Sequence, residues 1–362
     1  MPATFGLVDL FAGPGGLGEG FASLKVDGHS PFHIGISVEK EASAHRTLRL
    51  RAFLREYRRR YDCLPDQFID FHAGLTGEPD WSSVDAQSWR VALDEARALE
   101  LGTEAATTAV DDAITKLRQD FDETILIGGP PCQAYSLVGR ARSRGKLGYV
   151  PEEDERHYLS GEYVSVLDKR RPATLMMENV RVMLSSTVES RLVFEMLMED
   201  LSSLGTGRGH QYELRAIRVQ DGTAGLQQAM RPSDFIVRAE EFGVPQRRHR
   251  VIIVGIRSDI ANRAAGAQIA VSGMARTVSD AIGTMPALRS GISRGRDDVS
   301  AWQHEIVRAA KELSSICMGE DGEALRDAFL SIAQRLEDVA PNARAASRLS
   351  EGYGTSNDEL MR

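Results

Sequence analysis

The stretch FGLVDLFAGPGGLG, residues 5–18, decides the fold. Its apolar part, Phe5 to Leu10, has the composition of a buried strand, and the glycines from Gly13 to Gly18 predict a tight turn into a short helix. A second apolar run, Phe32 to Val38, follows and ends at Glu39. A strand, a helix and a strand in this order predict a βαβ unit, the building block of a doubly wound parallel sheet.

The remaining sequence continues the alternation of helices and strands. Helical patterns cover Ala42–Tyr61, Trp89–Leu101 and Ala105–Leu117, and the last two fall in an expected helical insertion at about residues 78–120. Apolar runs predict later strands in ETILIGG, ATLMMENV, YELRAIRV and RVIIVGIR, and RLVFEMLMEDLSSLG predicts an amphipathic helix. Two further helices are expected around His304–Leu313 and Glu323–Leu336. The fold class is therefore α/β, with a main domain over residues 1–257 and a second region over 258–362.

Composition excludes several classes of protein. The 362 residues are 42% hydrophobic and 27% charged, and no apolar stretch approaches the roughly 20 residues that a membrane helix needs. The N-terminal residues lack the features of a secretory signal, so we expect a cytoplasmic protein. Three distant cysteines, Cys63, Cys132 and Cys317, support neither a disulfide framework nor a metal cluster. The net charge of -8 leaves nucleic-acid binding open, because that needs only a local basic patch.

The glycine-rich turn has the spacing of a nucleoside-cofactor site. Gly13, Gly15 and Gly18 fit Gly-x-Gly-x-x-Gly between a strand and a helix, where backbone N–H groups can approach a ligand. Glu39, at the end of the next strand, can accept both hydroxyls of a ribose. NAD and S-adenosylmethionine both carry adenosine, so the turn does not choose between them, and a purely structural turn is the alternative.

A second motif, GGPPCQAYS, holds Cys132 just beyond a buried strand. The two preceding prolines restrict the backbone, and ligand sites in open α/β sheets lie at the carboxyl ends of strands. A thiolate there can attack an electrophilic carbon. The alternative is a buried cysteine that packs as a small apolar side chain.

Two more stretches supply charged groups. Glu178 ends the buried run TLMME and is a candidate acid for a substrate ring, with a structural hydrogen bond as the alternative, while Asn179 is expected to hold the turn. In FGVPQRRHRVIIVGIR, an extended chain would place Gln246, Arg248 and Arg250 on one face, suited to a carbonyl oxygen or phosphate. A solvated basic turn is the alternative there. The arginines of REYRRRYD favour a solvated helix face over nucleic-acid contact.

The four motifs DLFAGPGGLGEGF, GGPPCQAYS, MENV and QRRHRV, in this order, resemble those of DNA (cytosine-5) methyltransferases over roughly residues 4–257. The dehydrogenase alternative explains only the glycine turn and Glu39. The resemblance implies a Rossmann-like domain that binds S-adenosylmethionine. It also implies that the substrate is double-stranded DNA and that the target cytosine is flipped out of the duplex. The region from residue 258 resembles the start of a target-recognition region.

The resemblance also implies the roles of particular residues. Cys132 would attack C6, Glu178 would contact N3 and the exocyclic amine, Arg250 would bind O2, and Arg248 would order the site. The residues implied to bind the cofactor are Phe11, Ala12, Gly13, Pro14, Gly15, Gly16, Leu17, Glu39 and Pro131. Those implied to contact DNA or the base are Gln133, Ser136, Arg140, Arg142, Arg144, Asn179 and Gln246.

The sequence departs from the family pattern at two places. Near HAGLT, Ala73 and Gly74 stand where many members place an aspartate against the adenine. The arginine-rich and asparagine-containing closing motifs have no match, so a second polypeptide is a possible partner that supplies them. Two alternatives therefore stay open beside a DNA-modifying enzyme of bacterial restriction-modification or phage defence. One is a transfer RNA methyltransferase of the same fold, and the other is a non-catalytic DNA-binding subunit.

Overall fold

The chain forms two compact units. A computed structural model describes residues 3–130, 159–188, 191–204, 211–264, 266, 268–271, 277–284, 292, 298–317 and 322–338. The first unit comprises Met1–Cys63 and Trp81–Gly283, and the second comprises Leu64–Asp80 and Thr284–Arg362. All of the candidate site residues that the structure describes lie in the first unit.

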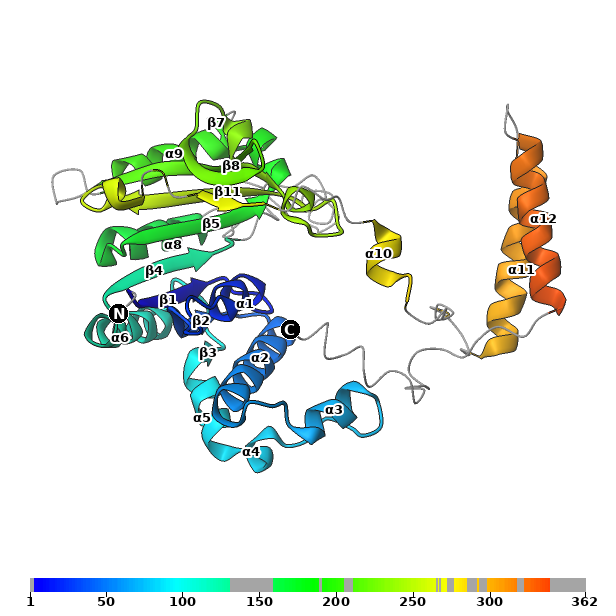
Figure 1. Cartoon of the computed structure of the whole chain (residues 1–362), viewed down its shortest axis with the longest axis horizontal. Helices are drawn as coiled ribbons and strands as arrows, with labels where there is room; N and C mark the ends of the chain where they lie inside the picture. Colours follow the sequence, from blue (N-terminus) through cyan, green and yellow to red (C-terminus); the bar gives the residue numbers. More distant parts are fainter. Residues whose placement is uncertain are drawn as a thin grey trace, which may run out of the picture. The chain divides into compact units, whose positions relative to one another are not determined.

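A single large sheet organises the first unit (Figure 1). Its strand order is β12-β9-β8-β11-β5-β4-β1-β2-β3, and β10 pairs with β11. The strands are β1 Phe5–Leu10, β2 Phe32–Val38, β3 Ala96–Arg97, β4 Glu123–Gly128, β5 Thr174–Val180, β8 Tyr212–Gln220, β9 Thr223–Gln228, β10 Ile236–Arg238, β11 His249–Arg257 and β12 Gln268–Ala270. A small separate ribbon pairs β6 Thr187–Val188 with β7 Arg191–Leu192.

The expected α/β fold is confirmed, and the direction of the strands changes within the sheet. Strands β3, β2, β1, β4 and β5 are parallel, as the βαβ pattern predicts. Beyond β5 the sheet is antiparallel, because β11 runs opposite to both β5 and β8. The carboxyl ends of the parallel strands and the amino end of β11 therefore meet at one edge.

A two-residue hairpin explains one strand that the sequence analysis missed. Asp221 and Gly222 join β8 to β9, with φ of 50° and 75°. Two successive positive φ values give the turn twist that suits a hairpin, and Asp-Gly is a strong signal for it. This dipeptide could have predicted β9 from the sequence.

Helices cover both faces of the sheet. One face carries α6, α8 and α9, and the other carries α1. The helices of the first unit are α1 Gly16–Ser23, α2 Ala42–Tyr61, α4 Trp81–Val84, α5 Ala86–Glu95, α6 Glu104–Asp120, α8 Leu159–Arg170, α9 Val193–Ser203 and α10 Val278–Ile282. The helix expected over Trp89–Leu101 is wrong at its end, since α5 stops at Glu95. Ala96 and Arg97 leave the helix because they pair with β2 as the edge strand β3.

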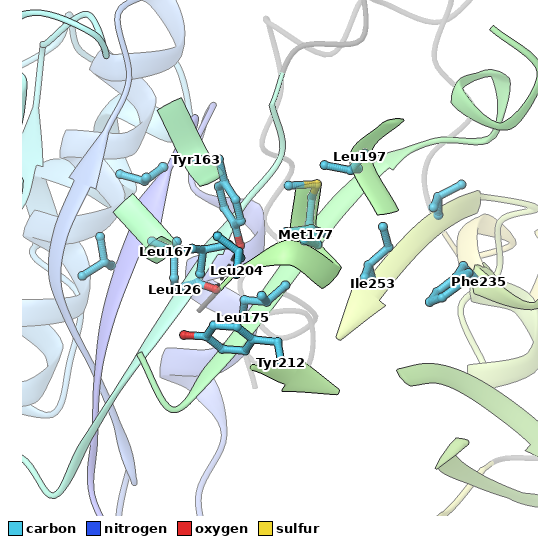
Figure 2. Packing of buried hydrophobic residues seen from close by; sticks show 14 of the residues in the cluster. Leu126, Tyr163, Leu167, Leu175, Met177, Leu197, Leu204, Tyr212, Phe235 and Ile253 are labelled. Atoms are coloured by element: carbon cyan, nitrogen blue, oxygen red, sulfur yellow. Dashed lines mark hydrogen bonds between the residues drawn. The ribbon is translucent and has the colours of Figure 1, made fainter. Parts of the chain in front are cut away.

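The larger apolar cluster lies on the face covered by α6, α8 and α9. It joins Val8 and Leu10 of β1 to Leu126, Leu175 and the other buried members of neighbouring strands. Figure 2 shows part of this cluster, including the fully buried Tyr163. The Tyr163 hydroxyl donates to the carbonyl oxygens of Leu126 and Met176, so a polar group in the core is satisfied.

The opposite face carries α1 and a smaller cluster. Leu7, Ile34, Ile125 and Ile127 from three parallel strands are buried there, and Leu17 and Phe21 of α1 pack against them. The alternation of side chains along β1 thus sends Leu7 and Asp9 to the α1 face and Val8 and Leu10 to the other. This arrangement fixes α1, and the turn before it, above the end of β1.

The second unit contains α3 Asp66–His72, α11 Val299–Ile316 and α12 Gly322–Asp338. The two long helices pack on each other, with an ion pair of 2.7 Å between Lys311 and Glu337. They confirm the two helices expected near His304–Leu313 and Glu323–Leu336. Within the described ranges, no helix is both long and apolar enough to cross a membrane.

Candidate functional site

The glycine turn is built by backbone conformations that redirect the chain after β1. Phe11 has φ of 57°, an unfavourable value for a side chain of its size, and Gly13 and Gly15 have φ of 57° and 87°. The Gly15 amide donates to the Ala12 carbonyl at 2.9 Å, closing the turn. A side chain at Gly15 would collide with Leu48 of α2, whereas Gly13 and Gly16 face open space. The turn thus leaves room for a ligand against its backbone.

Glu39 locks this turn to the end of β2. Its Oε2 accepts the Gly13 N–H at 2.9 Å, and its Oε1 accepts the Glu41 N–H at 2.7 Å. Each carboxylate oxygen can accept a further hydrogen bond, which suits the two hydroxyls of a ribose. The open backbone at Gly13 and Gly16, together with this half-buried carboxylate, fits the adenosine part of S-adenosylmethionine. Predicted cofactor residues from Phe11 to Leu17 and Glu39 therefore lie together.

Asp9 lies below the turn and was not singled out from the sequence. Its side chain is on the α1 face of β1, only 1% of the residue is exposed, and neither carboxyl oxygen has a hydrogen-bond partner in good geometry, although the Gly18 backbone N–H lies close enough to favour the charged form. Burial raises the pKa of Asp9 to about 8, and the negative charges of Glu95 and Glu39 act in the same direction. Asp9 is therefore an uncharged carboxylic acid at neutral pH, packed against Gly18 in α1.

Where the chain leaves β4 toward Cys132, the backbone of Gly128 and Gly129 packs closely against neighbouring residues. A Cβ on Gly128 would overlap the carbonyl oxygen of Leu10 in β1, so no larger residue fits there. A Cβ on Gly129 would lie 3.2 Å from Glu178 Oε2, which places this backbone beside the carboxylate. The Asn179 side chain, itself buried, donates to the Pro130 carbonyl at 3.0 Å and accepts the Val180 N–H at 2.9 Å. Asn179 thus holds the turn, as expected.

Glu178 and Arg250 form the charged pair of the site. Arg250 Nε lies 2.8 Å from Glu178 Oε1, and the two side chains are 25% and 31% exposed. They come from adjacent antiparallel strands, in which Arg250 is opposite Val180 and Ile252 is opposite Glu178. The structure therefore joins two predicted catalytic residues that are 72 positions apart in the sequence. A half-buried carboxylate with one oxygen toward an arginine and the other toward Gly129 can receive a polar ring.

The extended conformation expected for residues 246–250 is wrong for its first half. Strand β11 begins only at His249, and the Gln246 and Arg248 amides donate to carbonyls two residues earlier, both at 2.8 Å. Each such bond closes a tight turn, so residues 246–248 do not form a regular extended segment. Gln246 and Arg248 are exposed, and only Arg250 reaches Glu178.

The His249 side chain makes a contact with Glu240 that the sequence did not predict. Its Nε2 lies 2.7 Å from Glu240 Oε1, in the short η5 helix Ala239–Phe242. The hydrogen bond with His249 lowers the pKa of Glu240. Since the Arg250 guanidinium also donates to the His249 carbonyl at 2.9 Å, this residue helps to fix the start of β11.

The arginine-rich end of α2 makes ion pairs within the protein. Arg55 pairs with Glu19 and Glu95, Arg59 pairs with Glu56, and Arg60 lies 2.6 Å from Asp85. These arginines therefore join α2 to α1 and α5 or stabilise α2 itself. The side chains of Arg55 and Arg60 are 24% exposed, whereas that of Arg59 is 69% exposed, so the solvated face expected for this stretch describes Arg59 but not Arg55 or Arg60.

Part of the expected site lies outside the described residues. It comprises Pro131, Cys132, Gln133, Ser136, Arg140, Arg142 and Arg144. The site residues that the structure describes are the glycine turn, Glu39, Gly129, Pro130, Glu178, Asn179 and Arg250. Together these define an α/β protein with a nucleoside-type turn beside a carboxylate and arginine pair.

Comparison with known proteins identifies this class more closely. The family model for C-5 cytosine-specific DNA methylase matches residues 103–307, so the chain belongs to that family. It is 28% identical over 273 residues to "Type II methyltransferase M.Bpa9945I" of Bacillus paralicheniformis, covering 70% of this chain and 54% of that protein. It is also 28% identical over 251 residues to "Type II methyltransferase M.AquIA" of Picosynechococcus sp., covering 69% and 71%.

A third relative carries the activity in its name. "DNA (cytosine-5-)-methyltransferase M.ApeKI" of Aeropyrum pernix is 30% identical over 141 residues, covering 39% of this chain and 28% of that protein. The chain thus spans little more than half of the Bacillus relative and a smaller part of the Aeropyrum one. A solved structure described as a DNA modification methyltransferase encoded within a prophage (E. coli) overlaps with a TM-score of 0.44, at 17% identity, covering 81% of this chain and 59% of that one. This overlap is too low to assign the fold.

Proposed function

We propose that this protein is a DNA cytosine-5 methyltransferase that uses S-adenosylmethionine as methyl donor. The contact that carries the proposal is the 2.8 Å pair of Glu178 and Arg250, with the second Glu178 oxygen beside Gly129. A carboxylate paired with a guanidinium, the two groups that suit the polar edge of cytosine, therefore lies beside Gly129, which is three residues before Cys132 in the sequence. Family membership and the names of the relatives support the same activity.

The proposed roles follow from the chemistry of each group. The target cytosine leaves the duplex, since a stacked ring cannot be reached. The Cys132 thiolate adds to C6, while Glu178 hydrogen-bonds N3 and the exocyclic amine and Arg250 binds O2. The donor supplies the methyl group to C5. Loss of the C5 proton and expulsion of Cys132 then release 5-methylcytosine.

The remaining residues have supporting roles in this proposal. The turn from Phe11 to Leu17, with Glu39 and Pro131, binds the cofactor, and Arg248 orders the site. Gln133, Ser136, Arg140, Arg142, Arg144 and Gln246 are proposed to contact DNA or the flipped base, since arginine side chains suit phosphate. The relatives' type II names support a role in modifying bacterial DNA. The cytoplasm, where bacterial DNA lies, is the proposed location.

Covalent trapping tests the proposal. DNA containing 5-fluorocytosine blocks the loss of the C5 substituent, so wild-type protein with S-adenosylmethionine should form an adduct that survives denaturing electrophoresis. Cys132→Ser should abolish the adduct, and Cys317→Ser is the matched control that should retain it. An adduct with Cys132→Ser would show that the nucleophile is another residue.

A substrate comparison separates the alternatives. Labelled methyl transfer is measured to duplex DNA and to transfer RNA, with Glu178→Gln as a variant that should reduce transfer by at least about 100-fold, in the range of a lost general acid. Transfer to RNA alone would refute the DNA substrate. Binding of DNA with neither transfer nor trapping, alone and with a partner polypeptide, would indicate a non-catalytic subunit.

A further inference from the structure

Asp9 is a buried acid whose position the reaction above does not use. Its carboxyl lies under the first turn of α1, where a Cβ on Gly18 would be 3.0 Å from Asp9 Oδ2. The residue is 1% exposed, neither oxygen has a hydrogen-bond partner in good geometry, and the nearby Gly18 backbone N–H favours its charged form. A buried carboxyl without a good hydrogen bond lowers the free energy of unfolding, so the presence of an acid at this position needs a reason.

Three charged side chains and the Gly18 backbone N–H act on Asp9. Glu95 of α5 and Glu39 after β2 oppose a negative charge on Asp9, and Arg55 of α2 favours it. Arg55 is already neutralised by Glu19 of α1 and by Glu95. On the opposite face of the sheet, the negative charge of Asp9 adds to burial in raising the pKa of Tyr163 in α8. The local balance keeps Asp9 neutral at pH 7, since the pKa of Asp9 is raised to about 8.

This position lies directly beneath the turn that would hold the cofactor. Glu39, which bonds the Gly13 amide, is one of the charges that interact with Asp9. A cation bound above the turn would oppose the effect of the two glutamates, and in a low-dielectric interior such an effect is stronger than in water. The methyl donor carries a net charge of plus one, whereas its product, S-adenosylhomocysteine, carries none.

We propose that Asp9 distinguishes the methyl donor from the spent product by exchanging a proton, an inference that rests on the proposed use of S-adenosylmethionine. Binding of the cationic donor releases the Asp9 proton to solvent and leaves a buried carboxylate opposite the positive charge. Binding of the neutral product leaves Asp9 protonated. After methyl transfer, the carboxylate loses its counter-charge and takes up a proton from solvent. The donor is therefore preferred over the product increasingly as pH rises.

Calorimetry measures this exchange directly in the wild-type protein. Titrations with S-adenosylmethionine and with S-adenosylhomocysteine are run at pH 7.5 in phosphate and in Tris, whose ionisation enthalpies differ. The donor should release more protons than the product. Between pH 6.5 and 9 the ratio of the two dissociation constants should change roughly three- to tenfold in favour of the donor, because a tenfold change corresponds to one pKa unit.

Two variants separate the proton exchange of Asp9 from that of the ligands' own amino groups. Those amino groups titrate in the same way whichever protein is used. In Asp9→Asn the shape is kept and the proton is lost, so the excess of protons released by the donor should fall to that of the ligands alone. Asp200→Asn in α9, another carboxyl whose pKa is raised by burial, should behave as wild type. Equal excess release by wild type and Asp9→Asn overturns the inference, and equal release for both ligands in wild type does so without any variant. Failure of wild type to bind either ligand refutes the proposed function instead.

Discussion

Asp9 also makes the stability of the fold depend on pH. The pKa of Asp9 is about 8 in the folded protein and near 3.8 when the chain is unfolded. Between these values the folded state holds a proton that the unfolded state has lost, so the free energy of unfolding falls as pH rises from about 4 to about 8. Above pH 8 both states are ionised and this contribution no longer changes.

The prediction is that Asp9→Asn removes this dependence. The amide does not titrate, so the variant should gain stability over wild type as pH rises from 5 to 8, by up to about 1.4 kcal/mol per pH unit. Urea unfolding of the apo protein at pH 5, 6.5 and 8 measures it. A difference between the two proteins that stays constant across this range would show that Asp9 is ionised in the folded state.

The contact of α6 with the sheet depends on a match between one large side chain of the helix and two glycines of the strands. Leu117 lies over two glycines, since a Cβ on Gly6 or on Gly35 would approach its side chain to 2.9 Å or less. The helix can therefore lie close to β1 and β2 only because both strands have no side chain there. Helical periodicity predicted α6 from the sequence, but it could not predict which strand residues the helix would meet.

A double-mutant cycle tests this match. Leu117→Ala should cost about 2–5 kcal/mol by leaving a cavity, and Gly35→Ala should cost about 1–3 kcal/mol by overpacking. Together they should cost less than the sum by about 1 kcal/mol or more, because each relieves the other. Gly20→Ala on α1, where a Cβ meets nothing within 4 Å, is the control and should be neutral or slightly stabilising. Additive costs at Gly35 and Leu117 would contradict the packing.

Across the whole molecule, local patterns predicted the parallel half of the sheet and the residues at its edge. The glycine turn and Glu39 lie within 30 residues of each other, so their contact follows from one βαβ unit. The Glu178 and Arg250 contact depends on the antiparallel register of β5 and β11, which no local pattern contains. Asp9 in FGLVDL has the same pattern that singled out Glu178 in TLMME, an acid in a buried apolar run, so it could have been predicted from the sequence. The turn at Gln246 depends on backbone bonds within five residues.

Ligand binding should stabilise the whole first unit through Glu39. A saturating ligand adds RT ln(1 + [L]/Kd) to the free energy of unfolding, about 2.7 kcal/mol at 100 times Kd. S-adenosylhomocysteine should therefore raise the Tm of wild type by several degrees, and Glu39→Ala should lose most of this shift. Glu41→Ala is the matched control: Glu41 caps α2 through the Ser43 and Ala44 amides, so the variant should lower Tm yet keep the ligand shift. Scanning calorimetry with and without ligand measures both. An equal loss of shift in the two variants would contradict a direct contact between Glu39 and the ligand.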